Sequence, residues 1–98
     1  MRPLAALLLL AACASPSPQF LDATRSDVVV EGRSFAVFRE GTRVQVIRLG
    51  YAGPVDRRAI PDQMLRAVAL ATGCSPVPSS FQGDSGERRG RITCRGAP

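Results

Sequence analysis

Apolar and polar positions alternate along residues 27–49, and two glycine-containing pairs interrupt the alternation. Glu31-Gly32 and Glu40-Gly41 each lie between runs rich in valine and phenylalanine, a pattern typical of β-hairpin turns. With two-residue turns at these pairs, alternate side chains fall on one side of a three-stranded antiparallel meander. The side chains on that side are all apolar: Val28, Val30, Phe35, Val37, Val44 and Val46. The pattern therefore predicts a meander with one continuous apolar face.

This register also sets which side chains face each other across the strands. It places Val37 opposite Val44. It also places Arg33 opposite Arg48, at the margin of the apolar face. Because like charges directly opposite each other are destabilising, Arg33 and Arg48 are candidate contacts for an anion or a carboxylate. Alternatively, both guanidinium groups turn into solvent, or a bulge shifts the register.

Residues 61–73 carry the signals of a helix. Pro61 suits the first helical position, Asp62 complements the positive end of the helix dipole, and Gly73 suits the position just past the last turn. One apolar stripe contains Leu65, Val68, Ala69 and Thr72, and it is widened by Met64, Ala67 and Ala71. A helix this apolar must be largely buried, so we expect it to cover the valine side of the meander.

The remaining segments complete a small α+β domain over residues 27–95. Residues 50–59 read as a loop, residues 82–90 as a polar turn region, and Arg91–Cys94 as the last strand. The other side of the meander is mixed in polarity, so it is either a partner surface or, as we expect in one small domain, covered by the C-terminal hairpin or the Phe20-Leu21 segment. Phe20 and Leu21 would dock either there or on the membrane interface. The predicted fold is thus a three-stranded antiparallel meander packed by one helix and completed by a C-terminal strand or hairpin.

The N-terminal residues have the layout of a secretory signal. A brief positive region precedes an uncharged run, Leu4–Ala12, that is too short to cross a bilayer as a permanent helix. The run ends in Leu10-Ala11-Ala12-Cys13, which resembles the lipobox of bacterial lipoproteins. The resemblance implies that residues 1–12 are a signal peptide cleaved between Ala12 and Cys13, and that lipid on Cys13 anchors the protein to a membrane.

Two alternatives remain for this segment. Ala12-Cys13-Ala14 also fits an ordinary signal peptidase, which would release the protein without Cys13. Leu4–Ala12 would otherwise be a buried helix of the mature fold, although it has no polar side.

The lipoprotein resemblance also predicts where the domain is held. Residues 13–26 would be the lipidated cysteine and a Pro/Ser-rich tether, long enough to hold the domain some tens of Å from the headgroups. In that family an aspartate after the lipidated cysteine commonly marks inner-membrane retention. Ala14 stands at this position, which implies the outer membrane, with the domain facing the periplasm.

The chain has three cysteines. If Cys13 is consumed by lipid, Cys74 and Cys94 remain as a pair, and in an exported, oxidising compartment we expect them to form a disulfide. Closing a loop of about twenty residues would stabilise the domain by roughly 3 kcal/mol. The chain has no CxxC spacing and no histidine, so nothing in it indicates a metal or redox site. The order of elements, with a helix ending Gly73-Cys74, also resembles short uncharacterised bacterial lipoproteins.

The charges and motifs of the chain limit the possible functions but identify no specific partner. All thirteen basic residues are arginine, against eight acidic ones, and the densest basic cluster is Arg88, Arg89, Arg91 and Arg95. This cluster indicates either an anionic partner or a solvated strand edge. Gly83-Asp84-Ser85-Gly86 looks like the nucleophile segment of chymotrypsin-like proteases, but without a histidine base we expect only a turn. No cofactor motif is present.

The predicted function is therefore a membrane-anchored cell-envelope lipoprotein, acting without catalysis as an accessory module that binds a protein or an anionic envelope component. The alternative is a periplasmic carrier of a small ligand or lipid, held between the helix and the sheet. Nucleic acid is not an expected partner, because an exported protein does not meet it and the chain has one tyrosine and no tryptophan for stacking on bases.

Overall fold

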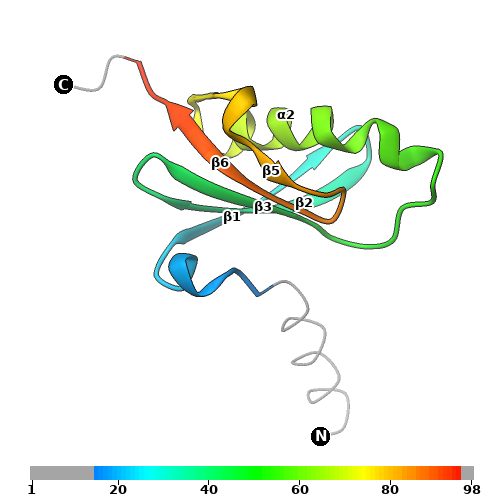
Figure 1. The fold of residues 1–98 in the computed structure, drawn as a ribbon, viewed down its shortest axis with the longest axis horizontal. Coiled ribbons are helices and arrows are strands. Elements are labelled where there is room, and N and C mark those ends of the chain that lie inside the picture. Colours follow the sequence, from blue (N-terminus) through cyan, green and yellow to red (C-terminus); the bar gives the residue numbers. More distant parts are fainter. Residues whose placement is uncertain (1–14, 96–98) are drawn as a thin grey trace, which may run out of the picture.

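The computed structural model describes residues 15–95, which form an antiparallel sheet with a helix on one side (Figure 1). The elements are η1 (Pro18–Phe20), β1 (Thr24–Val30), β2 (Arg33–Glu40), β3 (Arg43–Arg48), η2 (Asp56–Arg58), α2 (Ile60–Thr72), β4 (Ser75–Pro76), η3 (Pro78–Ser80), β5 (Gln82–Gly83) and β6 (Glu87–Thr93). The strand order is β1-β2-β3-β6-β4, and β5 also pairs with β6. The predicted α+β class is confirmed. The predicted signal peptide and lipobox lie outside the described residues.

The first hairpin has the predicted turn. Val30 pairs with Arg33, so Glu31-Gly32 is a two-residue connection. Both turn residues have positive φ, 52° at Glu31 and 79° at Gly32, as a type I′ turn requires. Glutamate rarely adopts this conformation, and Glu31 is the one such non-glycine residue in the described part of the chain.

The second hairpin turns one residue later than predicted. Glu40 pairs with Arg43, so the turn residues are Gly41-Thr42. The turn thus has glycine at its first central position, where φ is +63° and a side chain would be strained. Val37 faces Val46 and not Val44. Because every pairing moves by two residues, alternation is preserved and the predicted apolar side keeps its members.

The same shift overturns the predicted pairing of Arg33 with Arg48. Arg48 lies opposite Phe35, and Arg33 lies opposite Val30 in the first hairpin. The prediction failed because it depended on the exact position of the second turn. The apolar pattern does not fix that position, since a shift of every pairing by two residues leaves the same side chains on the apolar side.

The helix is confirmed with the expected end. Gly73 follows it in the left-handed conformation and donates its N–H to the Ala69 carbonyl at 2.8 Å. The buried side is rotated from the predicted stripe and contains Ile60, Gln63, Met64, Ala67 and Val68. Met64 and Ala67, which were predicted to lie at the margin of the apolar stripe, are at the centre of the buried side.

The helix covers the apolar side of the meander, as predicted. The most deeply buried side chains come from both layers: Phe35, Val37, Val44, Val46, Ile60, Met64 and Val68, each less than 2% exposed. Cys74 at the end of α2 and Cys94 just after β6 form the predicted disulfide, with an S–S distance of 2.02 Å. The interface between helix and sheet is therefore filled with side chains and closed by a covalent link.

The N-terminal segment covers the other side of the sheet, which we call the outer face. Phe20 is 2% exposed and packs against Ala36 and Phe38. The backbone N–H of Ser17 donates to the Gln45 side chain at 2.9 Å. The predicted domain boundary at residue 27 is thus too late, because β1 begins at Thr24 and residues from Ser17 onward already pack on the domain.

Candidate functional site

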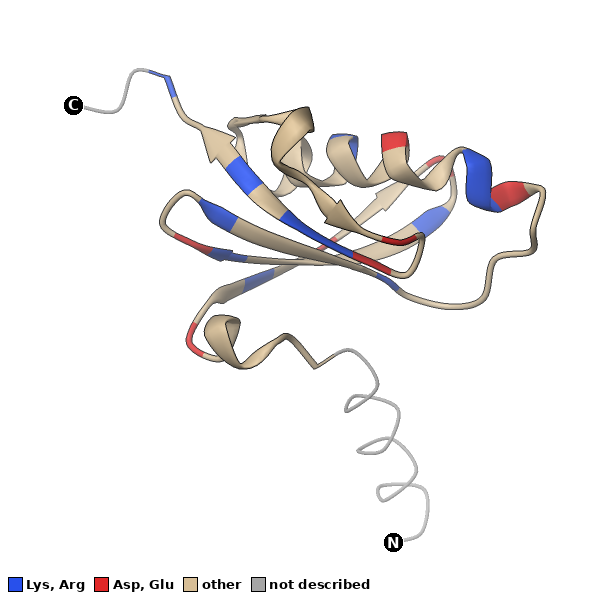
Figure 2. Ribbon diagram, viewed as in Figure 1, with Lys and Arg blue, Asp and Glu red and all other residues tan. Residues whose placement is uncertain are grey.

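Pairing of β3 with β6 brings arginines together on the outer face. Arg43 lies directly opposite Arg91, and Arg89 lies opposite Gln45. Val44, which lies between Arg43 and Gln45, belongs to the core beneath α2, so by the alternation of side chains the three arginines share the outer face. The basic positions along β6 are blue in Figure 2. An arginine pair across two strands is thus present, but at Arg43 and Arg91.

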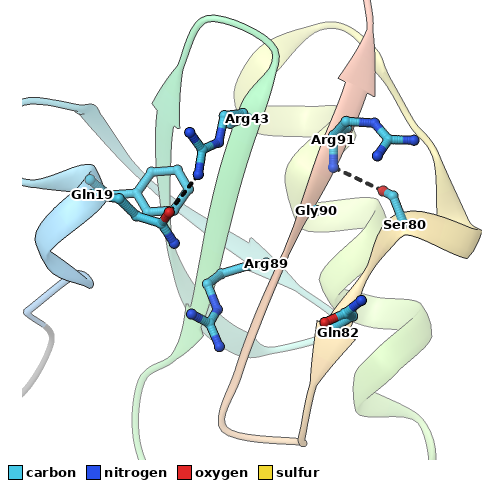
Figure 3. A pocket seen from close by; sticks show the side chains of 8 residues that line it. Gln19, Arg43, Ser80, Gln82, Arg89, Gly90 and Arg91 are labelled. Carbon is cyan, nitrogen blue, oxygen red and sulfur yellow. Dashed lines mark hydrogen bonds between the residues drawn. The ribbon is translucent and has the colours of Figure 1, made fainter.

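The three arginines line a pocket of about 340 Å³, which we call the arginine pocket. Figure 3 shows the pocket and the side chains that surround it. The lining residues are Gln19, Phe20, Arg43, Ser80, Gln82, Arg89, Gly90 and Arg91. They come from η1, β3, η3, β5 and β6, so the pocket forms only when distant parts of the chain have folded together.

The three arginines of the pocket differ in the partners of their guanidinium groups. Arg43 donates from Nη2 to the Gln19 side-chain carbonyl, and its guanidinium lies 5.8 Å from the centre of the Phe20 ring. Arg89 forms an ion pair with Glu87 at 3.0 Å. Arg91 forms no side-chain hydrogen bond or ion pair with residues 15–95. In Figure 3 the Arg43 and Arg91 side chains lean apart, which relieves the repulsion between opposed like charges.

The carboxylate beside the pocket already has partners. Besides the Arg89 ion pair, Glu87 accepts a hydrogen bond from the side-chain amide of Gln45 at 2.6 Å. Gln45 is 2% exposed, and the same amide donates to the Ser17 hydroxyl at 2.9 Å. A buried amide therefore joins the N-terminal segment to the wall of the arginine pocket, and the positions of Gln19 and Phe20 depend on this docking.

Phe81 and Ser80 fix the strand that carries two of the arginines. A Cβ at Gly90 would lie 2.5 Å from Cδ1 of Phe81, which is 6% exposed and belongs to the core under α2. The Ser80 hydroxyl accepts the backbone N–H of Arg91 at 2.9 Å. Only glycine lets the Phe81 ring approach β6 this closely, and the ring supports the strand from the side opposite the pocket.

The predicted contact residues Arg33 and Arg48 are bound elsewhere and are not brought together. Arg33 donates to the side chain of Gln63 at 3.3 Å and lies 3.8 Å from the Asp56 carboxylate. Arg48 donates to the backbone carbonyl of Ser85 at 2.9 Å. Neither residue lines the arginine pocket. The basic cluster around Arg89 and Arg91 was visible in the sequence, but its partner Arg43 was not, because nothing local predicts that β3 pairs with β6.

A second polar network fixes the Glu31 turn to the helix. Gln63, 5% exposed, donates from its amide to Glu31 at 2.9 Å, and Arg66 forms an ion pair with Glu31 at 2.7 Å. The hydrogen bond from Gln63, with those from Arg66 and its charge, holds the pKa of Glu31 below its usual value. These contacts stabilise the uncommon left-handed conformation of Glu31.

The protease-like segment is a turn, as predicted. The Asp84 carboxylate accepts the backbone N–H groups of Gly86 at 2.7 Å and Glu87 at 3.1 Å, and these bonds lower the pKa of Asp84. The segment connects β5 to β6. Within residues 15–95 no group of three or more histidine, cysteine, aspartate or glutamate residues is placed to hold a metal ion.

The predicted lipidation site Cys13 and its neighbour Ala12 lie outside the described residues, so the structure bears on the anchor only through the segment that follows. In the described part of the chain, no helix is both long enough and apolar enough to span a membrane. Comparisons with protein-family models, curated proteins and solved structures find no match to this chain. The arginine pocket is the feature from which a binding role can be argued.

Proposed function

We propose that this protein is a membrane-anchored cell-envelope lipoprotein whose domain binds an anionic envelope component without catalysing a reaction. The lipobox-like motif ending at Cys13 would supply the anchor, and the arginine pocket would supply the binding surface. The observation that carries the proposal is the docking of Ser17 on Gln45, because it keeps the arginine pocket close to the residue that would carry the lipid.

That docking sets an upper limit on the distance between the anchor and the docked segment. Ser17 follows Cys13 by four positions, and an extended chain spans at most about 3.6 Å per position, or about 14 Å in total. Ser17 binds Gln45, which lies opposite Arg89 on the outer face. The limit of about 14 Å is much shorter than the tether of residues 13–26 expected from the sequence. The docked Ser17 would therefore lie within about two Debye lengths of the anchor, since that length is about 8 Å at physiological salt.

The chemistry of the pocket supports binding over catalysis. Arginine stays protonated at any physiological pH, so it attracts anions but does not exchange protons as a general acid or base. The adjacent carboxylate of Glu87 is occupied by Arg89 and Gln45. We do not favour the carrier alternative, because the interface between helix and sheet is filled with side chains that are less than 2% exposed.

The mass of the mature N-terminus tests the anchor. We expect a chain that begins at Cys13 and carries a diacylglyceryl group, recovered with the outer-membrane fraction. Cys13→Ser is the matched control, because it removes the thiol and leaves the rest of the motif intact. A mature chain that begins at residue 15, after cleavage at Ala14, would contradict the proposal.

A further inference from the structure

We infer that the arginine pocket binds the phosphate of an anionic phospholipid headgroup in the leaflet that holds the anchor. The inference rests on the proposed function for its location and on the pocket itself for its chemistry. Arg43 and Arg91 lie opposite each other on two paired strands, and both line the pocket together with Arg89. Their side chains lean apart, and a phosphate in the pocket would be attracted by all three positive charges.

Phosphate fits the donors that are present. Guanidinium groups present pairs of N–H donors that match phosphate oxygens, and Arg91 has no described partner to give up. Within residues 15–95, the side chain of Arg43 is bound to the neutral side chain of Gln19 and to the face of Phe20. Three arginines with one carboxylate leave the pocket with an excess of positive charge. Its volume of about 340 Å³ is at the lower end of ligand sites, which span about 300–1,000 Å³, and suits a headgroup better than a large ligand.

The surroundings favour a headgroup over a free phosphate ion. Phe20 gives the pocket one aromatic wall, and the adjacent Leu21 is 69% exposed. Both residues belong to the segment that follows the predicted anchor, so Leu21 would face the interfacial region of the same leaflet. An exposed apolar residue beside a cationic pocket can make apolar contact with a membrane while the arginines reach its phosphates.

The test separates headgroup binding from anchoring by removing the anchor. The chain from residue 13 with Cys13→Ser keeps every contact described above, because all of them join residues between 15 and 95. Its partition onto vesicles of phosphatidylglycerol mixed with phosphatidylcholine is measured by co-sedimentation, with phosphatidylcholine vesicles as the reference. We expect binding only to the anionic vesicles.

Arginine variants locate the binding. Arg91→Gln is expected to lower the partition coefficient about fivefold and Arg43→Gln with Arg91→Gln about 25-fold, on the scale of one surface arginine near an anionic membrane. The matched control is Arg58→Gln, which removes the same charge from η2, outside the pocket lining. We expect less than a twofold loss from it. Thermal melts of all variants check that the domain remains folded.

The outcomes separate the pocket, the lipid and the anchor. Equal losses for Arg91→Gln and Arg58→Gln would mean that net charge alone drives binding, and would refute the arginine pocket as the binding site. Glycerol phosphate binding as tight as vesicle binding, with no effect of Leu21→Ser on the partition, would identify a free phosphate and overturn the lipid source. An unacylated Cys13 together with pocket-dependent vesicle binding would overturn only the anchor. An acylated Cys13 without that dependence would overturn only this inference.

Discussion

Substitution of Gly90 by alanine tests how closely Phe81 supports the pocket strand. The added methyl group would lie 2.5 Å from Cδ1, 2.6 Å from Cγ and 2.7 Å from Cε1 of Phe81. Carbon atoms in contact are normally about 3.5–4.0 Å apart, so the ring must move by about 1 Å. Because the ring is 6% exposed and packed in the core, it has little room to move.

The expected size follows from two opposing effects. Adding a methyl group to a packed site costs about 1–3 kcal/mol. Replacing a strand glycine by alanine returns about 0.5–1 kcal/mol, largely by restricting the unfolded chain. We therefore expect Gly90→Ala to lower the free energy of unfolding by about 1–2 kcal/mol. Phe81→Ala alone should lower it by about 3 kcal/mol, the lower end of the range for buried phenylalanine.

The double variant is the informative one. In the Phe81→Ala background the methyl group at residue 90 has space, so Gly90→Ala should be neutral or stabilising by up to about 1 kcal/mol. The assay is urea unfolding of the oxidised protein for both single variants, the double variant and the parent. Gly53→Ala is the control, because a Cβ there would meet no atom within 4 Å. Additive effects, or equal effects of Gly90→Ala and Gly53→Ala, would refute the reasoning.

Two further predictions concern stability. Replacing both Cys74 and Cys94 by serine should lower the free energy of unfolding by about 3 kcal/mol, because the bridge spans a sequence separation of 20; a change below about 1 kcal/mol in urea unfolding would contradict the entropic origin. Because folding lowers the pKa of Glu31, its carboxylate stabilises the folded state at pH values above the unfolded-state pKa. This stabilisation is lost as the pH falls through the folded-state pKa. Between about pH 6 and pH 3 the free energy of unfolding should therefore fall less for Glu31→Gln than for the parent. Equal falls would argue against the role of Gln63 and Arg66.

The local elements could be predicted because their signals are local. Pro61 and Gly73 mark the two ends of the helix, and the alternation of valines marks the apolar side of the meander. That side survived an error in the second turn, because the error moved every pairing by an even number of residues. Docking of Phe20 was one of two alternatives, since apolar residues after a Pro/Ser-rich stretch do not reveal which surface they contact.

The arginine pocket could be predicted only in part. The basic cluster that contains Arg89 and Arg91 was predicted as one candidate for an anionic partner. The predicted pair of Arg33 with Arg48 was wrong, because it depended on a turn that lies one residue further along than the pattern suggested. The true pair joins Arg43 to Arg91, residues far apart in the sequence that meet only because β6 inserts beside β3. Such a pairing is decided by the packing of the whole domain, and no local preference encodes it.

Docking of Ser17 on Gln45 also determines how the domain would respond to a pulling force. β1 is an edge strand, and tension applied directly at Thr24 could peel it from β2 one hydrogen bond at a time. Force arriving along the N-terminal segment meets Ser17, which is bound to β3 in the middle of the sheet, before it meets the buried ring of Phe20. These contacts must rupture before tension reaches β1, so the segment protects this edge strand from being peeled off the sheet by force at the N-terminus.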